Sequence, residues 1–217
     1  MKEASWVGGL QFPPPLFLRL GLAWVAPVLF TGFAAGALFY DDFENGLGRW
    51  QVESPWGLTT GRFASPTHSA TNSPGAYYTN RTDAALAMAV SVNLAGTLRP
   101  VLGFVHYHAL EPGYDFGLVE VSTKGGASWL PTPLAAYTGS TLDMTREQLD
   151  LSPYAGAANV RIRFRLVTDA SVVMDGWYVD DVLIGEAPVV IPAPALEEIT
   201  SHSIRVTWPP RDDPWFA

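Results

Sequence analysis

The feature that most constrains the fold is a short segment, Asn159 to Thr168, in which apolar and basic side chains alternate one by one. Side chains of a β-strand point alternately to its two faces, so a period of two predicts a strand with one buried face. The apolar positions expected to face the core are Val160, Ile162, Phe164 and Leu166, and the basic positions expected to face outward are Arg161, Arg163 and Arg165.

The surrounding region, residues 39–186, has the turn-rich and aromatic-rich composition of a chain built from short strands. It carries no convincing amphipathic helical pattern, and the whole chain contains 20 Gly, 18 Pro and 12% aromatic residues. Further strands are expected at 86–94, 101–110, 118–122 and 176–184, with Val179 inward. A tight hairpin is predicted at Lys124-Gly125-Gly126, with the returning strand resuming at Ser128-Trp129-Leu130.

The amino terminus has the pattern of an export signal. Lys2 and Arg19 precede an apolar run, Gly21 to Phe33, and Ala35-Gly36-Ala37 satisfies the small-x-small rule for signal peptidase. We expect residues 1–37 to be a signal peptide cleaved after Ala37. The alternative is an uncleaved membrane anchor extended to Tyr40, since about 20 apolar residues span a bilayer. Both interpretations export the rest of the chain.

The carboxyl-terminal part begins with a Pro/Ala-rich segment, residues 187–194, expected to be an extended linker. Residues 195–217 hold two strand-like runs, Leu196–Thr200 and Ser203–Trp208. A two-stranded piece buries too little surface to be stable alone, so we expect a truncated β domain from a longer protein. This fragment resembles the start of a fibronectin type III domain, in which Ile204 and Val206 lead to a core tryptophan, Trp208.

Several phrases of residues 38–186 occur together in a known order. The region opens with Asp41-Asp42-Phe43-Glu44-Asn45-Gly46 and closes with Gly176-Trp177-Tyr178-Val179-Asp180-Asp181-Val182. It resembles the MAM-like jelly-roll domain of immune inhibitor A type metallopeptidases and bacterial surface proteins. The resemblance implies an all-β fold: an antiparallel, two-sheet jelly-roll sandwich.

Charge and cysteine content exclude several classes of function. The formal net charge is -8, with 13 basic against 21 acidic residues, so a nucleic-acid partner is not expected. There is no cysteine, which excludes disulfides, thiolate zinc sites and cysteine nucleophiles. An exported protein without disulfides fits a bacterial extracellular protein whose core is large enough to stand unaided.

Acidic residues gather at both ends of the sandwich region. First and last strands of jelly rolls commonly lie together, and carboxylates brought together repel one another unless a cation lies among them. Calcium takes six to eight oxygen ligands and suits extracellular fluid, so we predict a structural calcium. The alternative is that these acids cap turns or pair with Arg161, Arg163 and Arg165. The predicted ligands are Asp41, Asp42, Glu44, Asp180 and Asp181.

Three further features have both a structural and a functional interpretation. His106 and His108 lie two apart on a strand and therefore face the same way; a metal site is the less favoured alternative to a core position. Four tryptophans are expected to pack in the core and hairpin, with sugar stacking as the alternative. The polar segment Ser65–Pro74, around His68, is expected to be a surface loop with possible partner contacts. The four tryptophans are Trp50, Trp56, Trp129 and Trp177.

No catalytic motif is present: there is no H-E-x-x-H, no G-x-S-x-G and no phosphate or dinucleotide loop. The sequence therefore favours a non-catalytic, monomeric extracellular module that binds a protein or glycan partner. The alternative is the accessory part of an exported hydrolase or a carbohydrate-binding module. Because the export signal directly precedes the sandwich region, we expect any catalytic domain to lie beyond Ala217.

Overall fold

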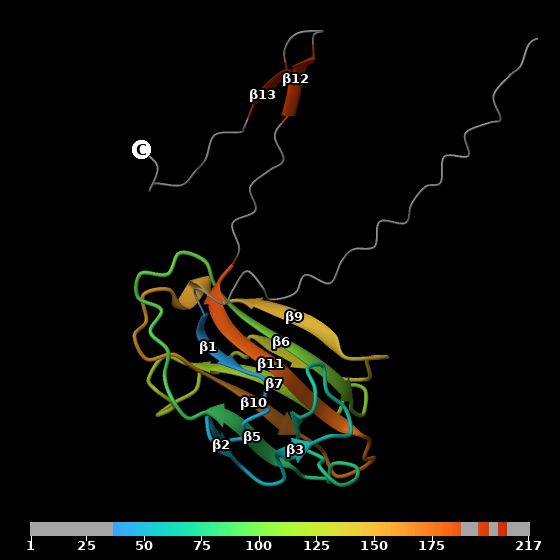
Figure 1. Ribbon diagram of the computed structural model, residues 1–217. Helices are drawn as coiled ribbons and strands as arrows, with labels where there is room; N and C mark the ends of the chain where they lie inside the picture. The colour runs from blue at the N-terminus through green and yellow to red at the C-terminus, as the bar shows by residue number, and fades with distance from the viewer. Residues whose placement is uncertain (1–36, 188–194, 200–203, 208–217) are drawn as a thin grey trace, which may run out of the picture. The chain divides into compact units, whose positions relative to one another are not determined.

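A computed structural model describes residues 37–187, 195–199 and 204–207. The predicted signal peptide and most of the predicted linker lie outside the described residues. Two antiparallel sheets face each other and enclose one core (Figure 1). The all-β, two-sheet sandwich expected from the sequence is confirmed. Within the described part of the chain, no helix is long and apolar enough to cross a membrane.

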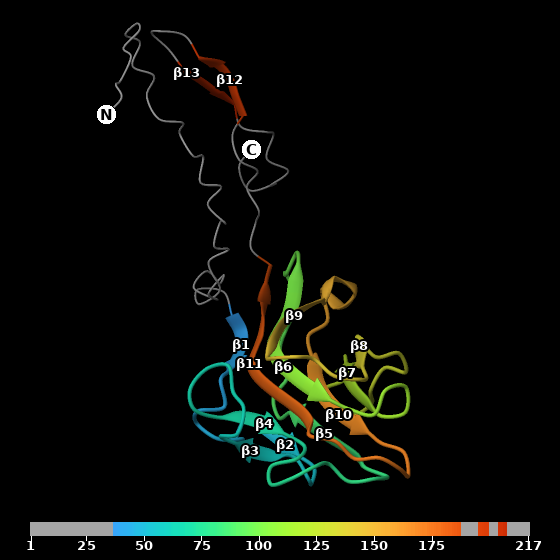
Figure 2. The ribbon, with the colours of Figure 1, turned by 90° about the vertical axis from the view of Figure 1, so that its right-hand side faces the viewer.

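The first sheet has six strands. In spatial order it contains β3 Gly57–Thr59, β4 Ser69–Thr71, β11 Gly176–Glu186, β6 Pro100–Ala109 and β9 Thr145–Asp150, and β1 Ala37–Asp41 also pairs with β11 (Figure 2). The first and last strands of the sandwich therefore do lie side by side, with Asp41 opposite Val182.

The second sheet has five strands, in the order β2 Trp50–Val52, β5 Asp83–Met88, β10 Arg161–Val167, β7 Phe116–Ser122 and β8 Ala135–Tyr137. A 3-10 turn, η2, spans Ser152–Tyr154. A separate two-stranded pair, β12 Ala195–Ile199 with β13 Ile204–Thr207, agrees with the two strands predicted in the carboxyl-terminal fragment. Assignment of that fragment to the fibronectin type III fold stays a prediction.

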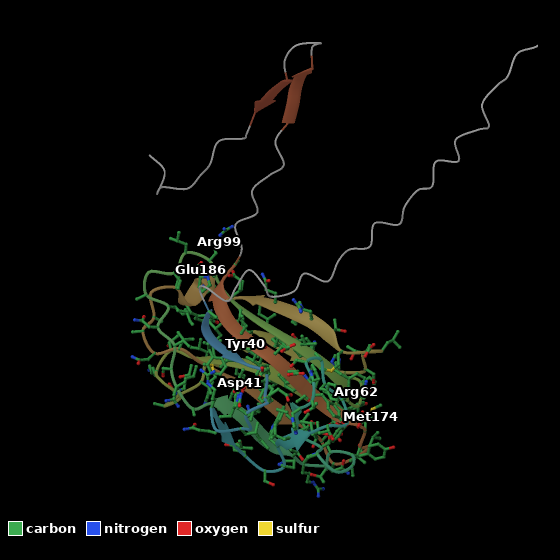
Figure 3. All side chains as sticks on the ribbon, in the orientation of Figure 1. Tyr40, Asp41, Arg62, Arg99, Met174 and Glu186 are labelled. Atoms are coloured by element: carbon green, nitrogen blue, oxygen red, sulfur yellow. The ribbon has the colours of Figure 1, made fainter. Side chains whose placement is uncertain are left out.

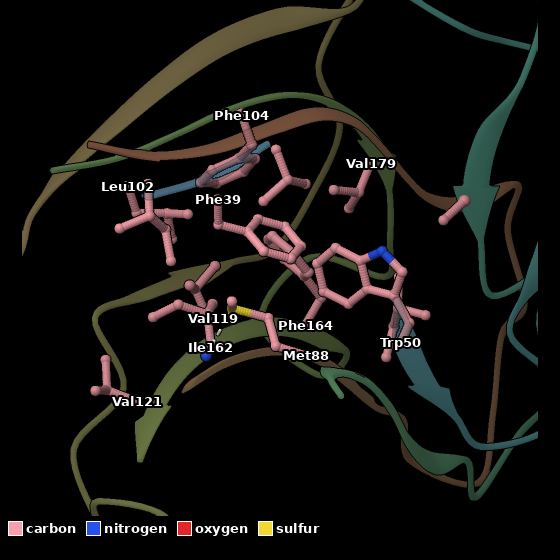
Figure 4. Packing of buried hydrophobic residues seen from close by; sticks show 14 of the residues in the cluster. Phe39, Trp50, Met88, Leu102, Phe104, Val119, Val121, Ile162, Phe164 and Val179 are labelled. Carbon is pink, nitrogen blue, oxygen red and sulfur yellow. Dashed lines mark hydrogen bonds between the residues drawn. The ribbon is translucent and has the colours of Figure 1, made fainter. Parts of the chain in front are cut away.

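The alternating segment forms β10, and its facing is as predicted. Val160, Ile162, Phe164 and Leu166 are fully buried, and so is Val179 on the opposite sheet. The Phe164 ring packs 5.2 Å from that of Phe104 and 5.5 Å from that of Trp177, between centroids (Figure 4 shows Phe164 among its neighbours). The core is therefore centred on aromatic contacts between the two sheets.

Two strand predictions need correction at their ends. The run at 86–94 is a strand only up to Met88, since β5 spans Asp83–Met88 and the pairing of Val92 with Val160 is an isolated bridge. The hairpin glycines Gly125 and Gly126 have positive φ, as expected. The returning strand, however, is Ala135–Tyr137 rather than Ser128–Leu130, because a longer connection follows the glycines.

The interpretation of Ser65–Pro74 as a surface loop is also wrong for its central part. Ser69–Thr71 form β4, paired with β3 and β11, and Ser69 to Ser73 are buried. Several of these polar side chains are hydrogen-bonded: the Thr71 and Ser73 hydroxyls lie 3.1 Å apart, and the Trp177 amide of β11 donates to the Asn72 Oδ1.

Candidate functional site

The acids predicted to bind calcium accept hydrogen bonds from nearby donors, and their role as calcium ligands stays a prediction. The Asp41 carboxylate accepts from the Phe43 amide at 3.0 Å and from the Trp50 indole at 2.9 Å. Asp42 accepts the Glu44 amide at 3.2 Å. These are turn-capping contacts, and they agree with the capping alternative for the amino-terminal acids.

Glu44 and Asp180 fasten the segment that precedes β4. Glu44 accepts the amides of Thr67 and His68, and Asp180 Oδ2 accepts the amides of Ala64 at 2.7 Å and Ser65 at 3.0 Å. Asp180 is fully buried, and burial raises its pKa to about 6. The two carboxylates therefore hold this segment by its backbone amides.

Asp181 lies at a break in the pairing of β11 with β6 and has a positive φ of 49°. Its carboxylate accepts the Tyr40 hydroxyl at 3.2 Å. The other part of the alternative, ion pairing with the three arginines of β10, is wrong. Arg163 pairs with Glu120 at 2.6 Å and Arg165 with Asp83 at 2.6 Å, both on the second sheet.

The histidines and three tryptophans occupy the core. His106 is 2% exposed and its Nδ1 lies 3.1 Å from the Trp177 indole nitrogen, which donates to it. Burial and the neighbouring His108 lower the pKa of His106 to about 4. Trp50, Trp56 and Trp177 are buried, so sugar stacking on these three is excluded. Trp129, on the other face of the second sheet, packs under the Arg163 guanidinium at 4.4 Å.

A different group of residues converges at one end of the sandwich. Three connections meet there: 72–82 between β4 and β5, 110–115 between β6 and β7, and 168–175 between β10 and β11. We call these three connections the loop end. Figure 3 places Met174, in the third loop, far from Arg99 and Glu186, which lie at the opposite end of the sandwich.

Tyr78 joins the three loops. Its ring packs with Leu110, Leu166 and Met174 in a small apolar cluster separate from the main core. Its hydroxyl donates to Asp115 Oδ2 at 2.6 Å and accepts the Glu111 amide at 3.1 Å. Its own amide donates to the Met174 carbonyl at 3.2 Å. One buried residue thereby fixes the positions of all three loops.

Three acids of the loop end can hold a cation. Carboxylate oxygens of Glu111, Asp115 and Asp169 lie within 4.8 Å of one another, and in the described residues no other set of three His, Asp or Glu groups converges in this way. The five acids predicted from the sequence therefore form no such group. Partial burial, and then the charges of Asp169 and Asp115, raise the pKa of Glu111. Its Oε2 is buried without a hydrogen-bond partner among the described residues.

The outer surface of the loop end is apolar and exposed. Tyr77 is 65% exposed and Tyr114 is 64% exposed, and Val172 and Val173 on the third loop are exposed as well. Val172 has a φ of 41°, a conformation that costs a β-branched residue energy and that is concentrated at functional sites.

A pocket of about 240 Å³ opens on the first loop. It is formed by Pro55 and by residues 72–79, including Pro74, Tyr77 and Tyr78, and contains no charged side chain. Sequence reasoning missed the loop end because its acids come from loops more than fifty positions apart in the chain: Asp169 bonds to Asp115 across 54 positions. The local signal for a binding surface is limited to the adjacent Tyr77 and Tyr78, and to Tyr114, which all lie in turn-rich segments.

Comparison with known proteins shows a similarity in sequence to part of a peptidase and a similarity in fold to a carbohydrate binding module. No family model matches the chain. It is 31% identical over 162 residues to Bacillopeptidase F of Bacillus subtilis (strain 168). The aligned region covers 68% of this chain and 11% of that protein. The chain therefore spans about a tenth of the relative's length.

Among solved structures, the sandwich is similar to the C-terminal family 22 carbohydrate binding module of Clostridium thermocellum Xyn10B. The TM-score is 0.50 at 15% identity, with 73% of this chain and 99% of that chain covered. The K3 cleaved adhesin domain of Lys-gingipain from Porphyromonas gingivalis w83 gives a TM-score of 0.49 at 15% identity, covering 70% and 99%. At this identity, the match to the binding module establishes the fold alone.

Proposed function

We propose that this chain is a non-catalytic module of an exported, multidomain protein and that it binds a protein or glycan partner through the loop end. The observation that carries the proposal is the pair of exposed tyrosines, Tyr77 and Tyr114, next to residues that are rigidly held. Tyr78 and Asp115, their immediate neighbours in sequence, are buried and bonded to each other at 2.6 Å. Aromatic side chains on fixed loops are typical of binding surfaces, since little side-chain entropy is lost on contact.

The fold supports this proposal by analogy. The similar carbohydrate binding module places a binding function on the same architecture, and loops on a rigid sheet scaffold commonly carry recognition. Export of the module rests on the predicted signal in residues 1–37.

A second candidate function is that of an accessory domain in a peptidase. The observation in its favour is the 31% identity to a segment of Bacillopeptidase F. In that case the loop end docks to a catalytic domain of the same protein or to the peptide substrate. Both candidates use the same surface, so one set of variants tests both.

The test is a binding experiment with the purified chain against a printed glycan array and a displayed library of random twelve-residue peptides. The double variant Tyr77→Ala/Tyr114→Ala is expected to lose the binding that the wild type shows, with an unchanged thermal midpoint. Its matched control is Leu98→Ala, an exposed apolar residue whose amide bonds to Glu186 at the opposite end of the sandwich. Binding that survives the double variant, or hydrolysis of casein by the chain alone, contradicts the proposal.

A further inference from the structure

The pocket at the loop end selects for an apolar group. Its lining consists mostly of Pro, Ala, Gly and Tyr, and most of the short polar side chains in it are already bonded, although Asn72 Nδ2 is buried without a partner among the described residues. The Ser73 hydroxyl donates to the Asp175 carbonyl, Asn72 Oδ1 accepts from Trp177, and the Thr79 and Thr82 hydroxyls lie 2.9 Å apart. The pocket therefore offers the hydroxyl groups of a sugar ring few partners, and each polar group left unpaired costs binding energy.

The acidic group beside the pocket selects for positive charge. Tyr78 lines the pocket and bonds through its hydroxyl to Asp115, so pocket and acids are no more than one side chain apart. Both Asp115 oxygens are engaged, by the Tyr78 hydroxyl and by the Asp169 amide at 2.8 Å. The acceptors left for a ligand are the carboxylates of Glu111 and Asp169, because these two residues are partly exposed whereas Asp115 is buried.

The basic residues Arg62 and Arg81 lie near the loop end, and the Arg81 amide donates to the Asp169 carbonyl at 2.6 Å. Arg62 pairs with Asp175 at 3.8 Å and lies over the Tyr107 ring at 3.6 Å. The Asp169 carboxylate accepts the amide and hydroxyl of Ser171 in its own loop. An amine or guanidinium from a partner would neutralise the partly exposed carboxylates of Glu111 and Asp169.

Building on the proposed function, we propose that the loop end binds a polypeptide segment that presents a Lys or Arg side chain to Glu111 and Asp169 and seats a neighbouring apolar side chain in the pocket beside Tyr77. The exposed faces of Tyr114, Val172 and Val173 extend this surface for further apolar contact. The acids contribute charge complementarity and the pocket contributes apolar burial, which together fix the direction of the bound segment.

The experiment is selection of a displayed random twelve-residue peptide library on the whole chain, followed by anisotropy titration of the most enriched peptide at low and high salt. We expect enriched peptides to carry a Lys or Arg next to an apolar residue. Glu111→Gln and Asp169→Asn are each expected to weaken binding about tenfold, as is acetylation of the peptide lysine. Tyr77→Ala is expected to weaken all peptides, since it removes the wall of the pocket. Asp150→Asn is the matched control and is expected to change nothing, because Asp150 is an exposed acid that pairs with Val101, at the far end of β6 from loop 110–115.

Each other outcome overturns the inference in a recognisable way. Enriched peptides without a basic residue, or binding indifferent to Glu111→Gln and Asp169→Asn, contradict the choice of partner. A glycan that binds in place of peptides and is lost in Tyr77→Ala overturns the partner class while the proposed function stands. Calcium binding by titration calorimetry that disappears in Glu111→Gln shows that the acids serve a metal ion instead. If neither peptides nor glycans bind, the proposed function itself fails.

Discussion

The Tyr78 hydroxyl donates a hydrogen bond of 2.6 Å to the Asp115 carboxylate, and both residues are buried where three loops meet. Burial, and then this bond, raise the pKa of Tyr78, so the phenol stays protonated and remains the donor. A binding surface built from loops needs such a contact, because loops without buried bonds open at low cost in free energy.

The first prediction concerns this bond. Tyr78→Phe removes the donor to Asp115 and the acceptor of the Glu111 amide, while the apolar ring stays in place. Leaving buried polar groups unpaired is expected to lower the free energy of unfolding by about 1–3 kcal/mol. Urea unfolding of the variant measures it. Tyr77→Phe is the control, with an expected change within about 0.5 kcal/mol because Tyr77 is exposed. Equal losses in the two variants would show that the bond has no structural role.

The second prediction concerns the contact between Gly117 and Trp177. A β-carbon at position 117 would lie 2.7 Å from Cε3 of the Trp177 indole, which is fully buried. Gly117→Ala is therefore expected to destabilise the fold by about 1–3 kcal/mol through overpacking. Gly48→Ala, where a β-carbon meets nothing within 4 Å, is the matched control and is expected to be close to neutral. Similar urea midpoints for the two variants would contradict the described packing.

The third prediction concerns pH. The pKa of His106 falls from 6.5 to about 4 on folding, first because of burial and then because of His108. Between about pH 6.5 and about pH 4, His106 is protonated in the unfolded state and neutral in the folded state. The free energy of unfolding is therefore expected to fall as the pH drops through this range. The loss for this group is on the order of 3 kcal/mol. Unfolding free energies measured across this range should show a shallower slope in His106→Gln than in wild type. Parallel profiles would exclude His106 as the source.

The fourth prediction has the opposite sign. Burial raises the pKa of Asp180 from 3.8 to about 6, against the opposing effect of the amides of Ala64, Asp181 and Ser65. Its protonated form is therefore favoured in the folded state, and the stability it contributes below pH 3.8 is lost as the pH rises to about 6. In Asp180→Asn this pH-dependent loss is expected to vanish. Asp180→Ala removes Oδ2, the acceptor of both the Ala64 and the Ser65 amide, so hydrogen exchange at these two amides is expected to quicken in that variant. Unchanged exchange at both amides would contradict the clamp.

The fifth prediction separates two possible calcium sites. Calcium bound by Asp41, Asp42, Glu44, Asp180 and Asp181 stays a prediction from the sequence, and at 100 times its dissociation constant a bound ion adds about 2.7 kcal/mol. Thermal melts with and without EGTA are compared for wild type, Asp42→Asn and Glu111→Gln. An EGTA effect lost only in Asp42→Asn places the ion at the domain's joined ends, whereas one lost only in Glu111→Gln places it at the loop end. If EGTA does not change the thermal midpoint of the wild type, both calcium sites are excluded.

The sandwich itself could be predicted because its signals are local. Alternation in β10 follows directly from the geometry of a strand with one buried face, and the facing of Phe164 and Ile162 was correct for that reason. The positive φ of Gly125 and Gly126 likewise follows from the turn residues. The strand that returns after this hairpin was misplaced because the length of a longer connection is set by tertiary pairing with β7.

The candidate site could not be predicted because it depends on contacts between distant residues. The metal hypothesis was based on acids that are adjacent in sequence, such as Asp180 and Asp181. At the break in the pairing of β11 with β6, however, Asp180 bonds to the Ala64 amide and Asp181 bonds to the Tyr40 hydroxyl. No sequence motif contains Glu111, Asp115 and Asp169. These acids lie close together in the folded chain, where Tyr78 bonds to Asp115 and contacts all three loops. The spacing of these acids along the chain does not predict that they lie close together in the fold.

The central claim is that the loop end is the binding surface, and the most direct test is to map the contact on the whole chain. Amide chemical shifts are recorded by NMR during titration with the most enriched library peptide. Our account predicts that the largest changes fall in residues 72–82, 110–115 and 168–175, with Tyr77 and Tyr114 among them, and that they disappear in Glu111→Gln. Changes concentrated instead on β9, on Arg62 and Tyr107, or at the opposite end near Arg99 and Glu186 would contradict it.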